Sequence, residues 1–172
     1  ATPTVSIFGN IVSTSWTSAT TLFGTSVPDL HSPWFMRDPP EAQRSYSSIL
    51  NNNAAAYAQS RLGENQAWLA NNNAAGEWMK IDLGSTLPVV GIVTLGRYGH
   101  AQFVKSYKVQ TSTDDVTFSD VNGGAVFAGN RAWNVKVEHT FSAVQARYVK
   151  ILPQTWQTRI TMRAALLISS NQ

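Results

Sequence analysis

The sequence predicts an all-β fold, either a sandwich or a jelly roll, and three observations lead to this prediction. Apolar and polar residues alternate with a period of two from residue 78 onward, as they do in half-buried strands. Turn-forming residues, such as Asn122, Gly123 and Gly124, separate the alternating runs. Charged residues make up only 13% of the chain, below the roughly 25% of an average soluble protein. Many short strands at close spacing are typical of these two architectures.

Eight segments are predicted to be strands, and no convincing amphipathic helix is present. The predicted strands are 78–83, 89–96, 104–112, 116–121, 125–128, 133–141, 147–152 and 160–168. Alternation is clearest in the sixth of them, where one side carries Trp133, Val135, Val137, His139 and Phe141. In segment 54–70 alanines favour a helix, but runs of Asn flank it, so we expect an irregular segment with one helical turn.

The segment 27–43 contains four of the seven prolines and is therefore predicted to be neither regular helix nor central strand. Trp34, Phe35 and Met36 lie within it. Two interpretations are open for these three side chains: they pack against a core, or they form an exposed apolar patch.

Length and composition limit the class of protein. A chain of 172 residues suits one well-buried domain. The chain has no Cys, which excludes a disulfide framework, a thiolate metal site and a Cys nucleophile. The net charge is +3, and the basic residues occur singly from Arg37 to Arg163. A nucleic-acid-binding protein would show a clustered basic stripe, so we predict no nucleic-acid partner, whereas anionic sugars or lipids are compatible with such a surface.

Catalytic motifs do not occur in the sequence. It contains no Gly-x-Ser-x-Gly, no His-Glu-x-x-His and no phosphate-binding Gly loop. Asp114 and Asp115 are adjacent, so they would not form an acid–base pair across a substrate. His31, His100 and His139 are too scattered to indicate a triad or a metal site. We therefore predict that the protein is not an enzyme.

Six blocks of sequence follow one another in a familiar order and spacing. They are SRLGENQAWLANNN (60–73), EWMKIDLG (77–84), VVGIVTLGR (89–97), FVKSYKVQTSTDDVTF (103–118), VFAGN (126–130) and ARYVKILPQTWQTRITMR (146–163). In these blocks the chain resembles the discoidin domain, also called the coagulation factor five/eight C-type domain. The resemblance implies a galactose-binding-like, eight-stranded antiparallel jelly-roll β-sandwich over residues 45–172, with binding loops at one end. Residues 1–44 do not match and are expected to form an N-terminal Ser/Thr/Pro-rich extension packed on or beside the domain.

The sequence departs from the discoidin pattern at three points. The terminal Cys pair of many extracellular members is absent, as in the Cys-free lectin branches. The last strand usually contains Arg-x-Glu, but Ala165 replaces this Glu, which is a calcium ligand in members that bind the ion. Calcium is therefore doubtful as a cofactor, with Glu64 and Asn65 as weak candidate ligands. The first loop of lipid-binding members presents bulky aromatic residues, whereas segment 48–58 is dominated by Asn and Ala.

Three loops are expected to meet at one end of the sandwich: residues 49–57, 97–102 and 130–134. Loops on a rigid sheet commonly carry binding function. Aromatic rings can stack on the apolar face of a pyranose, and Asn, Gln, His and Arg can hydrogen-bond its hydroxyls. The candidate ligand-binding residues are Asn52, Asn53, Tyr57, Arg97, Tyr98, His100, Gln102, Asn130, Arg131 and Trp133.

Several of these aromatic and polar residues also have a structural interpretation. Asn51–Asn53 suit a turn as well as a ligand site, because Asn tolerates left-handed backbone. Arg97 is equally suited to a ligand contact and to a structural pairing, and Trp133 to ligand and to core. The other Trp side chains, at 68, 78 and 156, are predicted to lie in the scaffold core, and Asp82 is predicted to bond backbone or a neighbouring Arg.

The predicted function is that of a carbohydrate-binding, lectin-like module for adhesion or recognition, located outside the cell or at its surface. The discoidin resemblance suggests galactose-type glycans or glycoproteins as partners. Each hydrogen bond to a sugar contributes only about 1 kcal/mol, so useful affinity would need oligomers or a larger multidomain chain. Two alternatives are open: binding of anionic phospholipid at a membrane surface, and protein–protein adhesion through the same loops.

Overall fold

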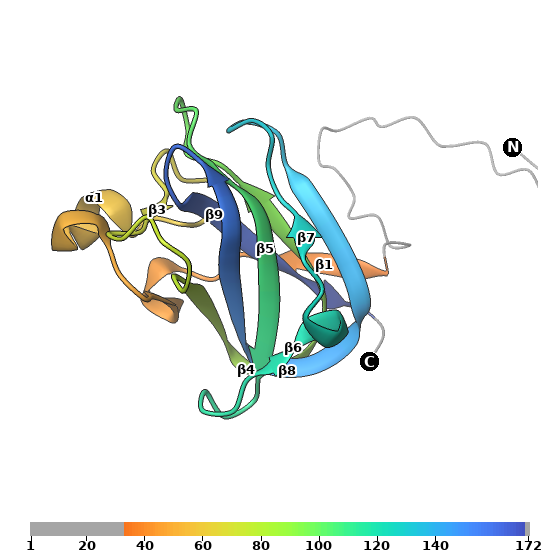
Figure 1. Cartoon of the computed structure of the whole chain (residues 1–172). Coiled ribbons are helices and arrows are strands. Elements are labelled where there is room, and N and C mark those ends of the chain that lie inside the picture. Colours follow the sequence, from red (N-terminus) through yellow and green to blue (C-terminus); the bar gives the residue numbers. More distant parts are fainter. Residues whose placement is uncertain (1–32, 171–172) are drawn as a thin grey trace, which may run out of the picture. The chain divides into compact units, whose positions relative to one another are not determined.

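Residues 33–170 are the part of the chain that the structure, a computed structural model, describes. Nine strands dominate it (Figure 1). They are β1 (Trp34–Arg37), β2 (Arg44–Tyr46), β3 (Trp68–Leu69), β4 (Met79–Leu95), β5 (Phe103–Ser112), β6 (Ser119–Asp120), β7 (Phe127–Ala128), β8 (Val137–Gln157) and β9 (Thr161–Ser169). The helix α1 (Ala54–Tyr57) is one turn long, and three 3-10 turns span Glu41–Gln43, Leu50–Asn52 and Val121–Gly124. This α1 turn is the one expected in segment 54–70.

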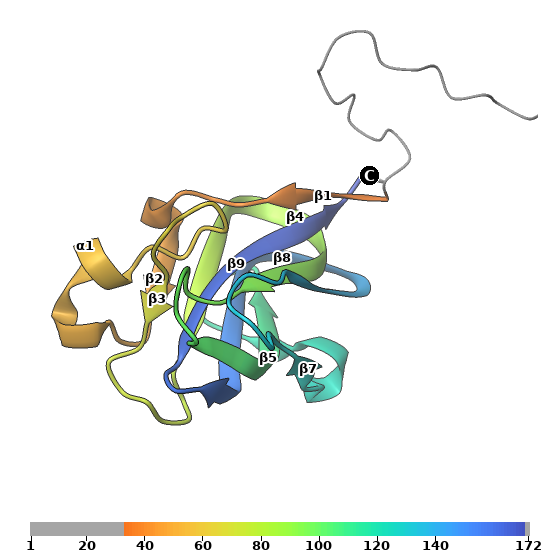
Figure 2. The same cartoon turned by 90° about the horizontal axis from the view of Figure 1, so that it is seen from above.

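The strands pair antiparallel in the order β1-β9-β4-β8-β5-β6, with β2 beside β4, β3 beside β9 and β7 beside β5. The long strands β4 and β8 belong to both layers of the sandwich. The first part of β4 pairs with β2 and with the end of β8, which continues to β5. After register shifts between residues 82 and 91, β4 pairs with β9 and with the start of β8. The bend is visible from above in Figure 2. The all-β jelly-roll prediction is therefore confirmed, although the predicted strands 78–83 and 89–96 are the single strand β4, and the predicted strands 133–141 and 147–152 are the single strand β8, which begins at Val137.

The main core lies between the two layers and follows the period-two pattern. On β4, Met79 and Ile81 are fully buried while Lys80 lies on the other side of the strand. Trp68 is fully buried, stacks on Tyr46 with ring centres 5.5 Å apart, and donates its indole N–H to the Ser48 carbonyl. Its predicted core role is confirmed. A smaller cluster consists of Leu62, Val93, Leu95, Ala165 and Leu167.

The predicted core position of Trp78 is wrong. Its side chain is half-buried and lies on the outward face of the sheet, on the same side as Lys80. The ammonium groups of Lys80 and Lys150 lie 5.8 and 5.1 Å from its ring centre. A cation beside an aromatic ring is attracted by the ring's quadrupole, so this Trp packs against charges instead of the core. Trp156 is half-buried and packs against the main core.

The strand β1 comes from the Pro-rich segment 27–43 and is the outermost strand of the described sheet, paired only with β9. An outermost position agrees with the expectation that this segment forms no central strand. Trp34 packs against the smaller core cluster, whereas Phe35 and Met36 are about half exposed. The core interpretation thus holds for Trp34, and the interpretation as exposed apolar residues holds for Phe35 and Met36. Residues 33–44 join the sandwich, and the rest of the expected extension, 1–32, lies outside the described residues.

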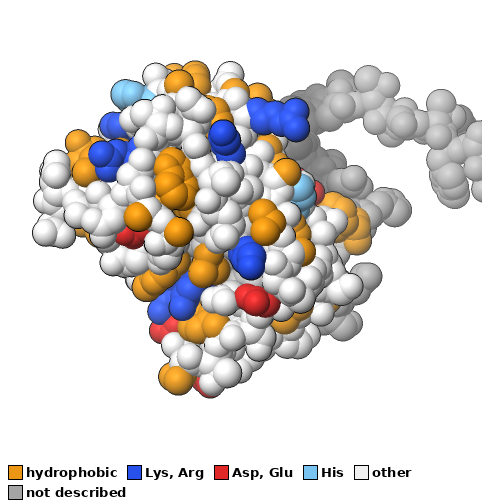
Figure 3. Space-filling view, viewed as in Figure 1, with side chains coloured by type: hydrophobic (Ala, Val, Ile, Leu, Met, Phe, Trp, Pro, Cys, Tyr) orange, Lys and Arg blue, Asp and Glu red, His pale blue; other side chains and the backbone are white. Residues whose placement is uncertain are grey.

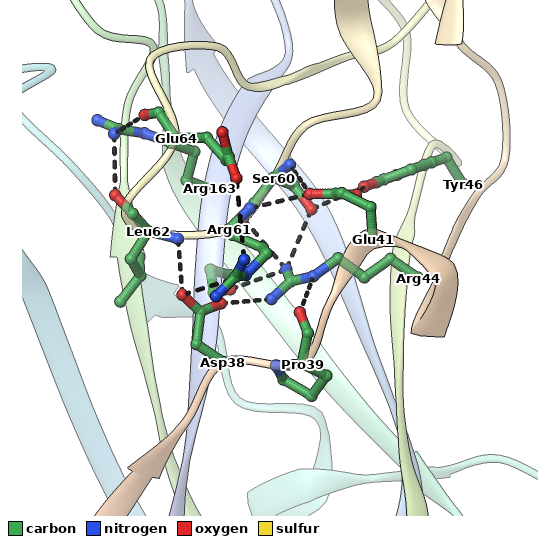
Figure 4. A network of polar contacts seen from close by, with 11 residues as sticks. Asp38, Pro39, Glu41, Arg44, Tyr46, Ser60, Arg61, Leu62, Glu64 and Arg163 are labelled. Carbon is green, nitrogen blue, oxygen red and sulfur yellow. Dashed lines mark hydrogen bonds and ion pairs between the residues drawn. The ribbon is translucent and has the colours of Figure 1, made fainter. Parts of the chain in front are cut away.

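A buried guanidinium group connects three distant parts of the chain (Figure 4). The side chain of Arg44 is fully buried and donates to the carbonyl oxygens of Pro39, Ser60 and Ala164 at 2.9–3.1 Å. It also donates to the Asp38 carboxylate at 2.6 Å. Burial lowers the pKa of this guanidinium, and nearby carboxylates counteract the shift. The contacts join the segment before β2, the start of the 60–64 segment and the strand β9.

Replacing Arg44 with Leu should lower the free energy of unfolding by about 3–5 kcal/mol, because the change removes a donor from each of three buried carbonyl groups and from the Oδ1 atom of Asp38. Urea unfolding followed by fluorescence measures this loss. The matched control is Arg147→Leu, which breaks the more exposed pair with Asp82 and should have a much smaller effect. Equal losses in the two variants would contradict the prediction.

The connection between β5 and β6, at the opposite end from the predicted binding loops, contains a turn organised by Asp114. Its carboxylate accepts hydrogen bonds from the N–H groups of Thr117 and Val116, both at 2.9 Å, and from the Ser112 hydroxyl at 2.8 Å. These bonds lower the pKa of Asp114 to about 2. Asp115 pairs with Lys80 at 2.6 Å, so the two carboxylates serve separate structural contacts.

An NMR titration should find a pKa of about 2 for Asp114, below the ordinary value of 3.8. Because the folded value is the lower one, the ionised group stabilises the fold above pH 3.8, and this contribution is lost as the pH falls towards about 2. Ser112→Ala should raise the pKa, since it removes one donor, whereas Ser119→Ala should not change it. A wild-type value near 3.8 would refute this assignment.

Candidate ligand-binding site at the loop end

The three predicted loops contact one another at one end of the sandwich, which we call the loop end. In Figure 1 the β4–β5 and β7–β8 connections project from the same end. The guanidinium carbon of Arg97, in the second loop, lies 5.8 Å from the ring centre of Tyr57, at the end of the first. Tyr98 and Trp133, which we call the aromatic pair, meet edge to face with ring centres 4.9 Å apart. These contacts link the second loop to both of the others.

The second loop is a tight turn held by its own backbone. The Arg97 N–H donates to the Gln102 carbonyl, the His100 N–H to the Arg97 carbonyl, and the Gln102 N–H to the His100 carbonyl. Gly99 has a φ of +70°, in the left-handed region that glycine adopts without strain. His100 is exposed at the tip of this loop. The turn therefore holds Tyr98 and His100 at the surface, where a ligand can reach them.

The third loop packs directly on the end of β4 at Gly96. A Cβ atom at this position would lie 2.8 Å from the Cα of Trp133 and 2.9 Å from the Cβ of Phe103. No side chain other than hydrogen fits between these groups. The close approach of the two backbones fixes Trp133 beside the second loop, and this is how the aromatic pair forms.

Polar groups surround the aromatic pair. The Nη1 of Arg97 donates to the Gln102 Oε1 at 3.2 Å, which leaves further guanidinium donors for a ligand. Tyr98 is 53% exposed, and Trp133 is half-buried. The site thus combines an exposed ring, a supporting ring and hydrogen-bonding side chains. Elsewhere on the visible face, Lys and Arg side chains are spread singly and do not form one basic patch (Figure 3).

Asn130 does not face the solvent at the loop end, contrary to the expectation that it contacts a ligand. It is 1% exposed, and its Nδ2 donates to the carbonyl oxygens of Thr94 and Val135 at 3.1 and 2.8 Å. Its backbone N–H donates to the Val104 carbonyl. The side chain braces the third loop against β4, which gives Asn130 a structural role, and a ligand contact by Asn130 stays a prediction. Because a buried Asn and an exposed Asn look alike in a loop sequence, only the fold separates them.

The first loop follows the turn interpretation of its asparagines. Asn51 and Asn52 both have a φ of 55°, in the left-handed region. The Asn53 side chain accepts a hydrogen bond from the Ala56 N–H and so caps α1. All three asparagines are exposed. Only Tyr57, at the end of this loop, has a described contact with the second loop, and a ligand contact by Asn52 or Asn53 stays a prediction.

A hollow of about 400 Å³, which we call the groove, lies beside the third loop. Its lining includes Phe103, Lys105, Asn130, Arg131, Thr155 and Gln157. Of these, the sequence analysis singled out only Asn130 and Arg131. Lys105 on β5 and Gln157 on β8 are far apart in the sequence and come together because Phe103 pairs with Gln157 across the two strands. No local pattern signals that pairing.

The residues at the candidate calcium position do not fit this ion. The carbonyl oxygens of Leu62 and Glu64 accept hydrogen bonds from the Nη1 of Arg163 at 3.0 and 2.6 Å. A guanidinium group that occupies carbonyl oxygens repels a divalent cation. Ala165 is buried in the smaller apolar cluster. Within residues 33–170, no group of three or more His, Cys, Asp or Glu side chains is arranged to hold a metal ion.

Comparison with known proteins identifies the relatives of this fold. The F5/8 type C domain family profile matches residues 42–166. Mouse lactadherin is 41% identical over 111 residues, which cover 61% of this chain and 24% of that protein. Mouse retinoschisin is 31% identical over 128 residues, covering 71% of this chain and 56% of that protein. The chain spans about a quarter of the length of the lactadherins that it matches.

Solved structures have the same architecture. Discoidin II from Dictyostelium discoideum superimposes with a TM-score of 0.60 at 25% identity, over 73% of this chain and 53% of that one. A CBM32 module from Clostridium perfringens, solved in complex with GalNAc-β-1,3-galactose, gives a TM-score of 0.62 at 13% identity, over 78% of this chain and all of that one. No helix in the described part of this chain is long and apolar enough to cross a membrane.

Replacing Asn130 with Ala should lower the free energy of unfolding by about 1–3 kcal/mol, because the Thr94 carbonyl would stay buried without a donor. Thermal or urea unfolding measures the change. Asn134→Ala is the control, since Asn134 is an exposed residue of the same loop and should leave stability unchanged. If the two variants behave alike, the bracing role is wrong.

Proposed function

The chain belongs to the F5/8 type C domain family, and from this premise we propose that its loop end binds carbohydrate, in a lectin-like module for adhesion or recognition. One observation carries the proposal: the aromatic pair, an exposed Tyr98 supported by a half-buried Trp133, stands beside Arg97 and Gln102 where three loops meet. This combination of an aromatic surface with fixed polar groups suits a sugar ring, which has an apolar face and a rim of hydroxyls.

The rigidity of the site supports this function. Gln102 and Arg97 are held by each other and by the backbone of the second loop, so they lose little conformational freedom when a ligand binds. Tyr98 rests edge-on against Trp133, which limits the rotation of the exposed ring. A galactose-type glycan is the ligand that the discoidin resemblance suggests, with glycoproteins as its natural carriers.

Affinity for a single sugar would be low, because each hydrogen bond contributes only about 1 kcal/mol against water. Several sites acting together, in a homo-oligomer or in a longer chain with further modules, would raise the avidity. We propose that the module acts outside the cell or at its surface, where glycans of this kind are displayed.

The exposed apolar side chains argue against insertion into a lipid bilayer. A protein that inserts loops into a membrane presents clustered apolar residues there. In the described structure the exposed large apolar side chains are Phe35, Met36, Tyr98, Val116, Val126 and Val135, and none of them belongs to the first loop. The first loop presents Asn and Ala at its surface, and Ile49 and Leu50 are half-buried. Membrane binding is therefore the second candidate, on the strength of the basic residues Arg97 and Arg131 alone.

Replacing Tyr98 or Trp133 with Ala should weaken binding to galactose-type glycans by about tenfold or more, equivalent to about 1.4 kcal/mol, because the sugar loses its stacking surface. A glycan array identifies the ligand and calorimetry measures the loss. The control is Phe35→Ala, an aromatic residue of similar exposure, 47% against 53%, on the strand β1.

The unfolding temperature of each variant separates a ligand contact from a structural role. Tyr98→Ala should bind weakly and melt like the wild type. If Tyr98→Ala binds as well as the wild type, or if only anionic vesicles bind and no glycan does, the proposal is wrong.

A further inference from the structure

We propose that the groove beside the third loop selects a negatively charged glycan, one whose hexose units carry a carboxylate or a sulfate. This inference rests on the proposed function, since it assigns the charge of the sugar that the loop end binds. The acidic group would lie between Lys105 and Arg131, while a neighbouring sugar ring of the same chain lies against the aromatic pair.

The charge of the groove distinguishes it from three other hollows of the described structure. Lys105 on β5 and Arg131 in the third loop are both exposed at its wall, and no lining residue is Asp or Glu. Neither cation forms an ion pair within residues 33–170. An anion entering the groove therefore meets two cations and displaces no carboxylate from them.

Three other hollows each contain a carboxylate. One is lined by Glu41 together with Arg44, and its guanidinium is already fully bonded. A second is lined by Lys80 together with Asp82 and Asp115. A third is lined by Asp114 and has no cation. Only the groove, among these four, combines free cations with the absence of acidic groups.

The groove is also suited to the rest of a sugar. Its volume of about 400 Å³ falls within the range of about 300–1,000 Å³ that is typical of small-ligand sites. Thr155 and Gln157 add neutral polar groups that can bond hydroxyls. Phe103 adds an aromatic wall. These neutral polar and aromatic groups suit the hydroxyls and the ring of a sugar, in addition to its charge.

Continuity with the loop end allows one ligand to reach both places. Arg131 is two residues from Trp133, and Phe103 directly follows Gln102. Phe103 and Trp133 both flank Gly96 within 3 Å of its missing Cβ position. A glycan chain resting on the aromatic pair can therefore continue along the third loop into the groove. The guanidinium of Arg131 can hold a carboxylate or a sulfate through two parallel hydrogen bonds.

The test compares three polysaccharides with related backbones: uncharged galactan, polygalacturonate and a sulfated galactan. We expect the wild-type protein to bind at least one of the acidic polymers about tenfold more tightly than galactan, because hydrogen bonds to charged groups are stronger than neutral ones. Comparison of the two acidic polymers tells whether carboxylate or sulfate is the group. Raising the salt concentration from 50 to 500 mM should reduce this preference.

The double variant Lys105→Gln/Arg131→Gln should lose the preference for the acidic polymer and keep the binding of galactan. Lys108→Gln is the matched control, because Lys108 lies on the same strand β5 but does not line the groove. It should retain the preference. Binding to vesicles with and without phosphatidylserine is measured in a separate experiment, since an anionic membrane offers the same negative charge from another source.

The outcomes separate this inference from the proposed function. If the double variant keeps the preference, or if the wild type binds galactan and the acidic polymers equally, the groove does not select charge although the loop end still binds sugar. If no polysaccharide binds and the double variant abolishes vesicle binding, the cations serve a membrane and both proposals fail. The single variant Tyr98→Ala tests the loop end, because it should lose the binding of galactan. The variants at Lys105 and Arg131 test the preference for acidic polymers.

Discussion

The guanidinium groups of Arg44 and Arg163 are buried, and a buried charge is stable only when its donors are paired. Most of their partners are backbone carbonyl groups of distant segments. Arg44 reaches Pro39, Ser60 and Ala164, so the segment before β2 cannot separate from β9 without exposing or orphaning a charge. The 60–64 segment has no regular strand or helix of its own. Its conformation therefore depends on these two side chains together with the carboxylates of Asp38 and Glu41, which accept hydrogen bonds from the backbone N–H groups of residues 60–62.

The same constraint extends from the scaffold to the binding site. The Nε of Arg163 donates to the Gly96 carbonyl at 2.9 Å, at the point where β4 ends and the second loop begins. Gly96 in turn is the residue on which the backbone of Trp133 and the side chain of Phe103 are packed. The positions of the aromatic pair and of the groove thus both depend on Arg163, which lies on the last strand, β9. A binding surface made of loops can be rigid when its base is fixed in this way, and a rigid surface loses less entropy on binding.

The sequence predicts what depends on local pattern and misses what depends on long-range register. Alternation identifies the buried side of β4, and it places Trp78 on the same side as Lys80, which is the arrangement that the structure has. The buried position of Trp68 follows from its large apolar ring. A large ring opposite the apolar face suggests a strand that is covered on both sides, but Trp78 packs against Lys80 and Lys150 and lies outside the core. Asn130 could not be recognised as buried, since its partners come from two other segments. The groove requires β5 to pair with β8 across about fifty residues and two register shifts, and no local signal predicts that pairing.

Local charge explains how a weakly basic protein can favour an anionic ligand. The net charge of +3 is spread over the chain, and salt screens exposed charges beyond about 10 Å at 0.1 M, so long-range attraction contributes little. Selection must come from contact. Lys80 is already paired with the carboxylate of Asp115, and Asp82 lines the same hollow, so a ligand anion would have to compete with carboxylates there. Lys105 and Arg131 share a hollow in which no such competitor exists. In a fold of this kind the composition of each hollow, and not the total charge, decides which ligand is favoured.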